Sequence, residues 1–164
     1  IRGGRMDHSK VFEVRLAKPE DAPKIREITQ EAFTKYCELA GIDNIEALNE
    51  TVEDVINDIK TKLCFVAYIG EEIVGSVRVE VFDDKTAYLS RFGVSTKYQN
   101  LGIGKAIMNL VDVTMRTMEV KRICLHTASK VSSLIRFYYG RGFYIDSTTK
   151  DRGYIRALLC KDYS

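Results

Sequence analysis

The most informative stretch of this chain is Gln99-Asn100-Leu101-Gly102-Ile103-Gly104-Lys105-Ala106. A β-rich run ends just before it at Val94, and apolar residues at helical spacing follow it. Glycines let the backbone come close to a ligand, and the free N–H groups at a helix start, aided by the helix dipole, hold phosphate oxygens. The stretch therefore predicts a pyrophosphate site between a strand and a helix.

Two common phosphate-binding motifs do not fit this stretch. A dinucleotide-binding fingerprint needs a third glycine at position 107, where the chain has Ile107. A nucleoside-triphosphate loop needs glycine at position 99 and Ser or Thr at position 106, where the chain has Gln99 and Ala106. Two glycines before a helix also fit a helix start that packs tightly on a strand. A second motif has to decide between these interpretations.

That second motif is Phe137-Tyr138-Tyr139-Gly140-Arg141-Gly142-Phe143, which ends the next expected helix and enters a strand. Together, Gln-x-x-Gly-x-Gly after a strand and Tyr-x-x-x-Gly-Phe after the following strand and helix resemble the GNAT family of N-acetyltransferases. The resemblance extends over about residues 11 to 160 when the order of elements is included. It implies an enzyme that moves an acetyl group from acetyl-CoA to a primary amine by direct attack.

Hydrophobic periodicity along the chain predicts a mixed α/β (α+β) domain with the element order βααβββαβαββ. The resemblance implies a mixed sheet of six to seven strands flanked by about four helices. The predicted strands cover 11–16, 64–69, 73–82, 86–94, 122–127, 143–149 and 154–160. Helices are predicted to begin near Pro19, Thr51, Ile103 and residue 132, and residues 37–50 to form a loop.

Length and composition are those of one soluble globular domain. The chain has 164 residues, 45% of them hydrophobic and 29% charged, and no apolar run reaches the roughly 20 residues of a membrane span. Residues 1–5 precede Met6 and are interpreted as a remnant of expression, which leaves 6–164 as a single N-acetyltransferase domain. The net charge of +2 falls to zero without Arg2 and Arg5, which argues against a nucleic-acid partner. No membrane partner is expected either.

The cysteines argue against a metal site and a disulfide framework. No Cys-x-x-Cys pair occurs, and the only candidate ligands are Cys37, Cys64, Cys124, Cys160, His8 and His126. Three of the cysteines fall in apolar strand-like runs, where a free cysteine usually acts as a small hydrophobe. This use of cysteine fits a reducing compartment and favours a cytoplasmic location.

The resemblance implies how the acyl donor is held. Backbone N–H groups from Leu101 to Ala106 would cradle the pyrophosphate of coenzyme A, and pantetheine would lie beside the strand that ends Phe92-Gly93-Val94. A bulge around Gly93 would separate this strand from its neighbour and free backbone groups for pantetheine and for the thioester oxygen. The implied cofactor-binding residues are Phe92, Val94, Gln99, Asn100, Leu101, Gly102, Ile103, Gly104, Lys105 and Ala106.

The resemblance also implies one catalytic residue, Tyr138, whose phenol would donate to the departing CoA sulfur. By spacing alone Tyr138 could also be a core aromatic, because Leu134 and Ile135 lie one helical turn before it, but the Gly142-Phe143 context favours catalysis. Many family members carry asparagine where this chain has Val131, so that contact with the cofactor is absent or moved to Ser129 or Ser132.

The general base is left open. Some family members place a glutamate on the fourth strand, and the matching residue here is Tyr88. A base is needed because a lysine-like amine with a pKa of about 10.4 is mostly protonated at neutral pH. The candidates are Glu80, Asp83, Tyr88 and water.

The acceptor is expected to be cationic, either a polyamine-like small molecule or a basic peptide. Residues 38–54 contain six acids and no Lys or Arg, and the resemblance places this segment at the acceptor mouth. The acids are Glu38, Asp43, Glu46, Glu50, Glu53 and Asp54. A negative rim would concentrate cationic amines, although the same acids could merely solubilise a loop and cap a helix.

Two other functions fit the same sequence. One is a catalytically silent CoA-binding or metabolite-sensing module of the same fold. The other is acyl transfer through a cysteine nucleophile, with Cys124 and His126 two residues apart on one strand. The identity of the acceptor, the acyl chain preference and the oligomeric state, including a homodimer, are left open.

Overall fold

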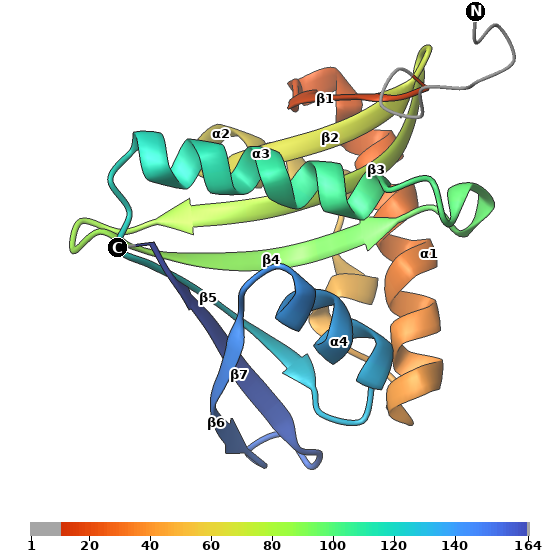
Figure 1. The fold of residues 1–164 in the computed structure, drawn as a ribbon. Coiled ribbons are helices and arrows are strands. Elements are labelled where there is room, and N and C mark those ends of the chain that lie inside the picture. Colours follow the sequence, from red (N-terminus) through yellow and green to blue (C-terminus); the bar gives the residue numbers. More distant parts are fainter. Residues whose placement is uncertain (1–10, 164) are drawn as a thin grey trace, which may run out of the picture.

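The structure is a computed structural model that describes residues 11–163. In this part of the chain seven strands form one mixed sheet in the order β1-β2-β3-β4-β5-β7-β6 (Figure 1). The predicted fold class and element order are confirmed. The strands are β1 (Glu13–Leu16), β2 (Leu63–Ile69), β3 (Glu72–Val81), β4 (Thr86–Val94), β5 (Arg122–Ala128), β6 (Tyr144–Thr149) and β7 (Arg156–Asp162). The α-helices are α1 (Ala22–Ala40), α2 (Val52–Thr61), α3 (Ile103–Thr117) and α4 (Ser132–Gly140).

Residues 1–5, interpreted as a remnant of expression, lie outside the described part. Within residues 11–163, no helix is both long enough and apolar enough to cross a membrane.

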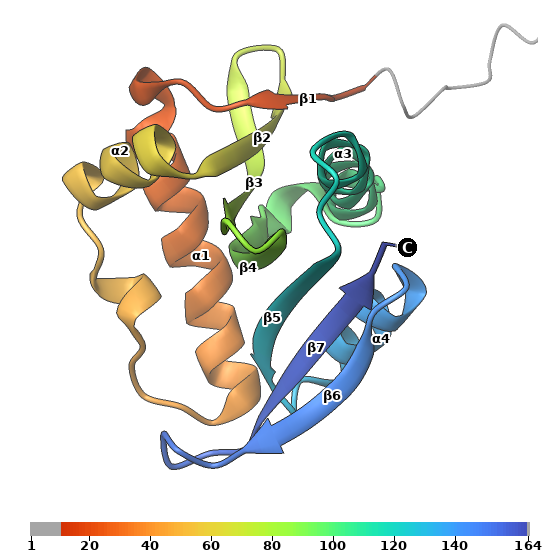
Figure 2. The same cartoon turned by 90° about the vertical axis from the view of Figure 1, so that its left-hand side faces the viewer.

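The helices cover both faces of the β1–β4 half of the sheet. Helices α1 and α2 lie on one face and α3 on the other (Figure 2). Because successive strand residues point to opposite faces, the neighbours Phe65 and Val66 enter different core layers. Val66 packs with Ile25 of α1 and Val55 of α2, whereas Phe65 belongs to the layer that contains Ile107 of α3. The sheet is thus buried on both sides where it supports the site.

The chain between α1 and α2 differs from the predicted loop. Helix α1 continues to Ala40, because Cys37 and Ala40 are buried on its inner face, and ends at Gly41 in the left-handed conformation with φ 70°. A short 3₁₀ helix, η3 (Glu46–Asn49), follows. The predicted capping box opens α2: the Thr51 hydroxyl accepts the Asp54 N–H at 3.1 Å, and the Asp54 carboxylate accepts the Thr51 N–H at 2.8 Å.

The sheet opens between β4 and β5. These parallel strands pair only from Thr86 to Tyr88, opposite Arg122 to Cys124, and then diverge (Figure 1). Farther along, β4 contains a bulge. Between the pairs Arg78↔Ser90 and Ser76↔Gly93, β4 has one residue more than β3. Arg91 in this bulge has φ 55°. The opening leaves backbone groups of β4 and β5 without partners in each other's strand.

Candidate active site

A cavity of about 680 Å³ lies at the opening between β4 and β5. Segments far apart in sequence line it: α1, the start of η3, β4, the start of α3, β5, α4 and the chain around the β6–β7 turn. Tyr138 is one of the lining residues. So are eight of the ten predicted cofactor residues: Phe92, Val94, Gln99, Asn100, Gly102, Ile103, Gly104 and Lys105.

The other two, Leu101 and Ala106, pack their side chains against the hydrophobic core and do not line the cavity. In addition, the Ala106 N–H donates to the Gly102 carbonyl at 3.0 Å, so it is already used within the first turn of the helix.

The start of α3 has the conformation expected of an anion site. Gly102 precedes the helix with φ 81°, and Asn100 is also left-handed with φ 66°. Ile103, Gly104 and Lys105 are the first three residues of α3, so their N–H groups have no acceptor one turn earlier in the helix. All three residues line the cavity. Their N–H groups and the helix dipole suit a phosphate at this end of the cavity.

Aromatic rings form the wall next to this helix start. Phe92 stacks on Phe137, with ring centroids 5.3 Å apart and an interplanar angle of 14°. A Cβ atom on Gly104 would lie 3.0 Å from the Phe92 ring, so glycine lets the helix approach this wall. Tyr138 packs edge-on against both phenylalanines.

Tyr138 is 4% exposed, and burial raises the pKa of its phenol, so it remains a neutral hydrogen-bond donor at physiological pH. The residue therefore belongs both to the aromatic wall and to the lining of the cavity.

A second polar group in the cavity pairs Tyr88, one of the candidate bases, with His126, and this pairing was not predicted from sequence. The Tyr88 hydroxyl lies 2.6 Å from His126 Nδ1, and both residues line the cavity. Burial raises the pKa of Tyr88, against the opposing charges of Arg156 and Arg152. Burial, followed by those same two charges, lowers the pKa of His126 below its ordinary value. At neutral pH the imidazole is therefore uncharged and able to accept a proton.

The other candidates for proton transfer lie elsewhere. Glu80 and Asp83 are exposed and do not line the cavity. The Cys124 sulfur lies 2.6 Å from the Cys160 sulfur on β7, while His126 Nδ1 is engaged with Tyr88. The geometry therefore gives no support to a cysteine nucleophile activated by His126.

Val131 stands where many family members have asparagine, and it directly precedes α4. Val131 is 3% exposed and lines the cavity with an apolar side chain. Of the nearby serines it is Ser133, and neither Ser129 nor Ser132, that lines the cavity. Ser133 is therefore the serine at this end of α4 that faces the cavity.

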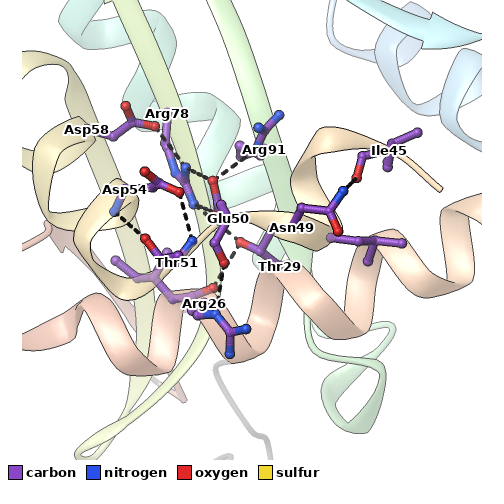
Figure 3. A network of polar contacts seen from close by, with 12 residues as sticks. Arg26, Thr29, Ile45, Asn49, Glu50, Thr51, Asp54, Asp58, Arg78 and Arg91 are labelled. Atoms are coloured by element: carbon purple, nitrogen blue, oxygen red, sulfur yellow. Dashed lines mark hydrogen bonds and ion pairs between the residues drawn. The ribbon is translucent and has the colours of Figure 1, made fainter.

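The acidic segment does not form the expected rim. Of its six acids only Glu46 lines the cavity. Glu50 is buried and pairs with Arg78 of β3 at 2.6 Å and with Arg91 of the β4 bulge at 3.3 Å (Figure 3). The basic residues that line the cavity are Lys35, Arg91, Lys105, Arg152 and Arg156. Sequence alone could not show this, because the partners of Glu50 lie 28 and 41 residues away.

Comparison with known proteins defines the class of protein. Residues 22–159 match the Acetyltransferase (GNAT) family, and the chain belongs to this family. Among curated relatives, N-alpha-acetyltransferase 30 of Xenopus laevis is 28% identical over 89 residues, and the human protein of that name is also 28% identical over 89 residues. These matches cover 52% of this chain but only 33% and 25% of the two relatives.

Solved structures with the same fold cover nearly the whole chain. The PaiA N-acetyltransferase from Thermoplasma acidophilum, crystallised in complex with coenzyme A, superposes with a TM-score of 0.81 at 21% identity. That match covers 93% of this chain and 99% of the other. The ribosomal-protein-S18-alanine N-acetyltransferase from Escherichia coli superposes with a TM-score of 0.76 at 16% identity, over 93% and 94% of the two chains. At these identities the likeness concerns the fold.

Proposed function

We propose that this protein is an acetyl-CoA-dependent N-acetyltransferase that acetylates a primary amine in the cavity between β4 and β5. The observation that carries the proposal is that one cavity is lined both by a helix start suited to a phosphate and by side chains that can donate or accept a proton. The anion-binding start of α3 lies at one part of the lining, and the Tyr138 phenol and the Tyr88–His126 pair lie at others. Family membership gives the reaction type, and the structural neighbour crystallised with coenzyme A supports the choice of donor.

The residues present fit a CoA thioester. The N–H groups of Ile103, Gly104 and Lys105 would hold the pyrophosphate. The backbone of β4 beyond Tyr88 has no partner in β5 and would serve the pantetheine arm and the thioester oxygen. Phe92 forms the apolar wall beside that arm. Acetyl-CoA would supply the acetyl group as a thioester, whose carbonyl carbon bonds to the amine nitrogen as the C–S bond breaks.

Tyr138 would donate a hydrogen bond to the leaving sulfur. A thiol has an ordinary pKa of about 8.5, and burial raises the pKa of the Tyr138 phenol above its own ordinary value. Full proton transfer from the phenol to the CoA thiolate is therefore unfavourable. Stabilisation of the developing negative charge by the hydrogen bond is therefore its main contribution.

Tyr88 and His126 would form the general base. With the proton of the neutral His126 on Nε2, Tyr88 receives the proton released from the amine nitrogen and passes its own proton to His126 Nδ1, 2.6 Å away. The pair takes the place of a glutamate base on the same strand, because a hydrogen-bonded neutral imidazole accepts a proton at neutral pH.

A catalytically silent CoA-binding module is the second candidate, because the start of α3 would bind coenzyme A whether or not turnover follows. A thiol-release screen separates the two. Purified protein is mixed with acetyl-CoA and amino acids, polyamines, aminoglycosides or peptides, and free CoA thiol is measured. Amine-dependent release supports the enzyme. Calorimetric binding of CoA without amine-dependent release supports the silent module.

A further inference from the structure

The part of the cavity beside the Tyr88–His126 pair is basic. Arg156 on β7 pairs in register with Ala128, and His126 with Leu158. Paired residues on neighbouring strands point to the same face of a sheet, and so do residues two apart on one strand. Arg156, the partner of Ala128, therefore lies on the same face as His126, on the neighbouring strand. Arg152, on the turn between β6 and β7, lines the same cavity. Both arginines are close enough to lower the pKa of Tyr88 and of His126.

Arg156 has donor capacity that the protein does not use. Its side chain is 12% exposed and contacts the Asp151 carboxylate through Nη2 at 3.2 Å. Its Nε–H is buried and has no hydrogen-bond partner in residues 11–163. A buried donor without a partner is unfavourable, and a carboxylate is the group that a guanidinium fork binds best. Asp151, 57% exposed on the turn, is a partner that a ligand can displace.

The balance of charge around the amine site points the same way. Glu46 is the only carboxylate of the 38–54 segment that lines the cavity, and Glu50 is neutralised by Arg78 and Arg91. Two arginines near the amine also disfavour its ammonium form, which favours the neutral nucleophile that the reaction needs. A purely cationic acceptor would meet repulsion here, whereas an anionic group on the acceptor would be attracted.

We propose that the acceptor is an amine that also carries a carboxylate, bound by Arg156 together with Arg152 while the amine faces the Tyr88–His126 pair. This inference rests on the proposed function and replaces the expectation of a cationic acceptor. A carboxylate of this kind belongs either to a free amino acid or to an acidic side chain close to the N-terminus of a peptide. The test has one arm for each source.

The first arm compares an α-amino acid with its amide, and the second compares a C-terminally amidated peptide with Asp or Asn at its second position. Rates are expressed per neutral amine, because amidation also lowers the pKa of the amine. We expect the carboxylate member of one pair to have a kcat/KM about tenfold higher or more. The arm that shows the preference identifies the source.

Variants assign the preference to the two arginines. Arg156→Gln and Arg152→Gln should each reduce it several-fold, whereas Arg122→Gln should keep it. Arg122 is the matched control because it also pairs with an aspartate on the sheet but does not line the cavity. If Arg156→Gln fails to fold by circular dichroism, Arg152→Gln decides, because that side chain is exposed.

Equal or faster acetylation of the uncharged members in both arms would overturn the inference and leave the proposed function standing. A preference that survives both arginine substitutions would also overturn it. Protein that binds CoA but acetylates no amine would overturn the proposed function, and the inference with it.

Discussion

At the scale of single residues, the hydroxyl of Tyr138 is the most direct test of the catalytic assignment. Tyr138→Phe keeps the ring in the aromatic wall formed with Phe92 and Phe137 and removes only the donor. We expect kcat to fall roughly a hundredfold, with little change in acetyl-CoA affinity, because the donor acts when the thiolate forms. Steady-state kinetics with an acceptor for which chemistry limits the rate, together with calorimetry, measure both quantities.

Tyr139→Phe is the matched control, because Tyr139 is the next residue, is 50% exposed and does not line the cavity. An unchanged kcat in Tyr138→Phe would make Tyr138 a core aromatic, the alternative that its spacing from Leu134 and Ile135 left open.

If His126 is the base, kcat should depend on pH in a particular way. Burial and the charges of Arg156 and Arg152 lower its pKa, with a weaker opposing effect from Asp151. The base must be neutral, so kcat should stay high at neutral pH and fall as the pH drops through a value below the ordinary 6.5 or so. In His126→Gln this acidic limb should disappear and the rate at pH 7 should fall roughly a hundredfold. An acidic limb that is identical in His126→Gln would exclude His126 as the base.

At this scale the sequence predicted the residues that belong to motifs and missed those that depend on register. The two motifs picked out Tyr138 and Gly102, both of which line the cavity. His126 was considered as a possible metal ligand and as a partner of Cys124, but not as a partner of Tyr88. Its hydrogen bond to Tyr88 depends on the parallel pairing of β4 with β5, which no local pattern encodes.

At the scale of elements, the turn into α3 can be tested through its glycine. Gly102 has φ 81°, and a Cβ atom there would meet no atom within 4 Å. Gly102→Ala therefore costs about 1 kcal/mol of stability through backbone strain alone. Relief of this strain should shift the turn and the N–H groups that follow it. We therefore expect the affinity for CoA, measured by calorimetry, to fall about tenfold.

Gly140→Ala is the control for this substitution, because Gly140 ends α4, has no positive φ and would also meet no atom within 4 Å. Wild-type CoA affinity in Gly102→Ala would show that the pyrophosphate does not bind at the start of α3.

The chain between α1 and α2 is held by a buried ion pair. Glu50 accepts hydrogen bonds from Arg78, which is 1% exposed, and its backbone carbonyl accepts one from Arg26 (Figure 3). Glu50→Gln would leave Arg78 with Asp58 as its only charged partner among the described residues. We expect a loss of about 3 kcal/mol in the free energy of unfolding, measured in urea.

Glu53→Gln, on the exposed face of α2, should change the free energy of unfolding by about 0.5 kcal/mol or less. Equal stabilities of the two variants would show that the Glu50–Arg78 pair does not anchor this segment.

Local signals explain why the elements themselves were predictable. The capping box of Thr51 and Asp54 predicted the start of α2, and the β-rich run at 86–94 predicted both ends of β4. Residues 37–40 were assigned to the loop between the two expected helices, whereas burial of Cys37 and Ala40 extends α1 through them. The bulge at Arg91 was expected near Gly93, but its register comes from pairing with β3.

At the scale of the whole molecule, the site exists because the sheet divides. The β1–β4 part and the β5–β7 part meet through three residue pairs at one end and diverge at the other, and the cavity is lined from both (Figure 1). The order of elements and the two motifs predicted this fold. The charge at the acceptor end was not predictable, because it is set by partners such as Arg78 and Arg156 that only the folded chain brings near.

A ligand that spans both parts should stabilise the whole domain. CoA at a hundred times its dissociation constant should add about 2.7 kcal/mol to the free energy of unfolding. Thermal unfolding with and without CoA measures this, with the Gly102→Ala variant stabilised less at the same CoA concentration. A midpoint that does not move with CoA would contradict binding in the cavity.

The central claim is that this cavity transfers an acetyl group to an amine, and the most direct test follows the acetyl group itself. The protein is incubated with acetyl-CoA labelled with ¹³C at the acetyl carbonyl and with the amine panel, and NMR is recorded over time. We predict that the thioester carbonyl signal converts to an amide carbonyl signal, at the rate at which free thiol appears and only when an amine is present. A thioester signal that persists with every amine, in protein shown to bind CoA, would contradict the claim.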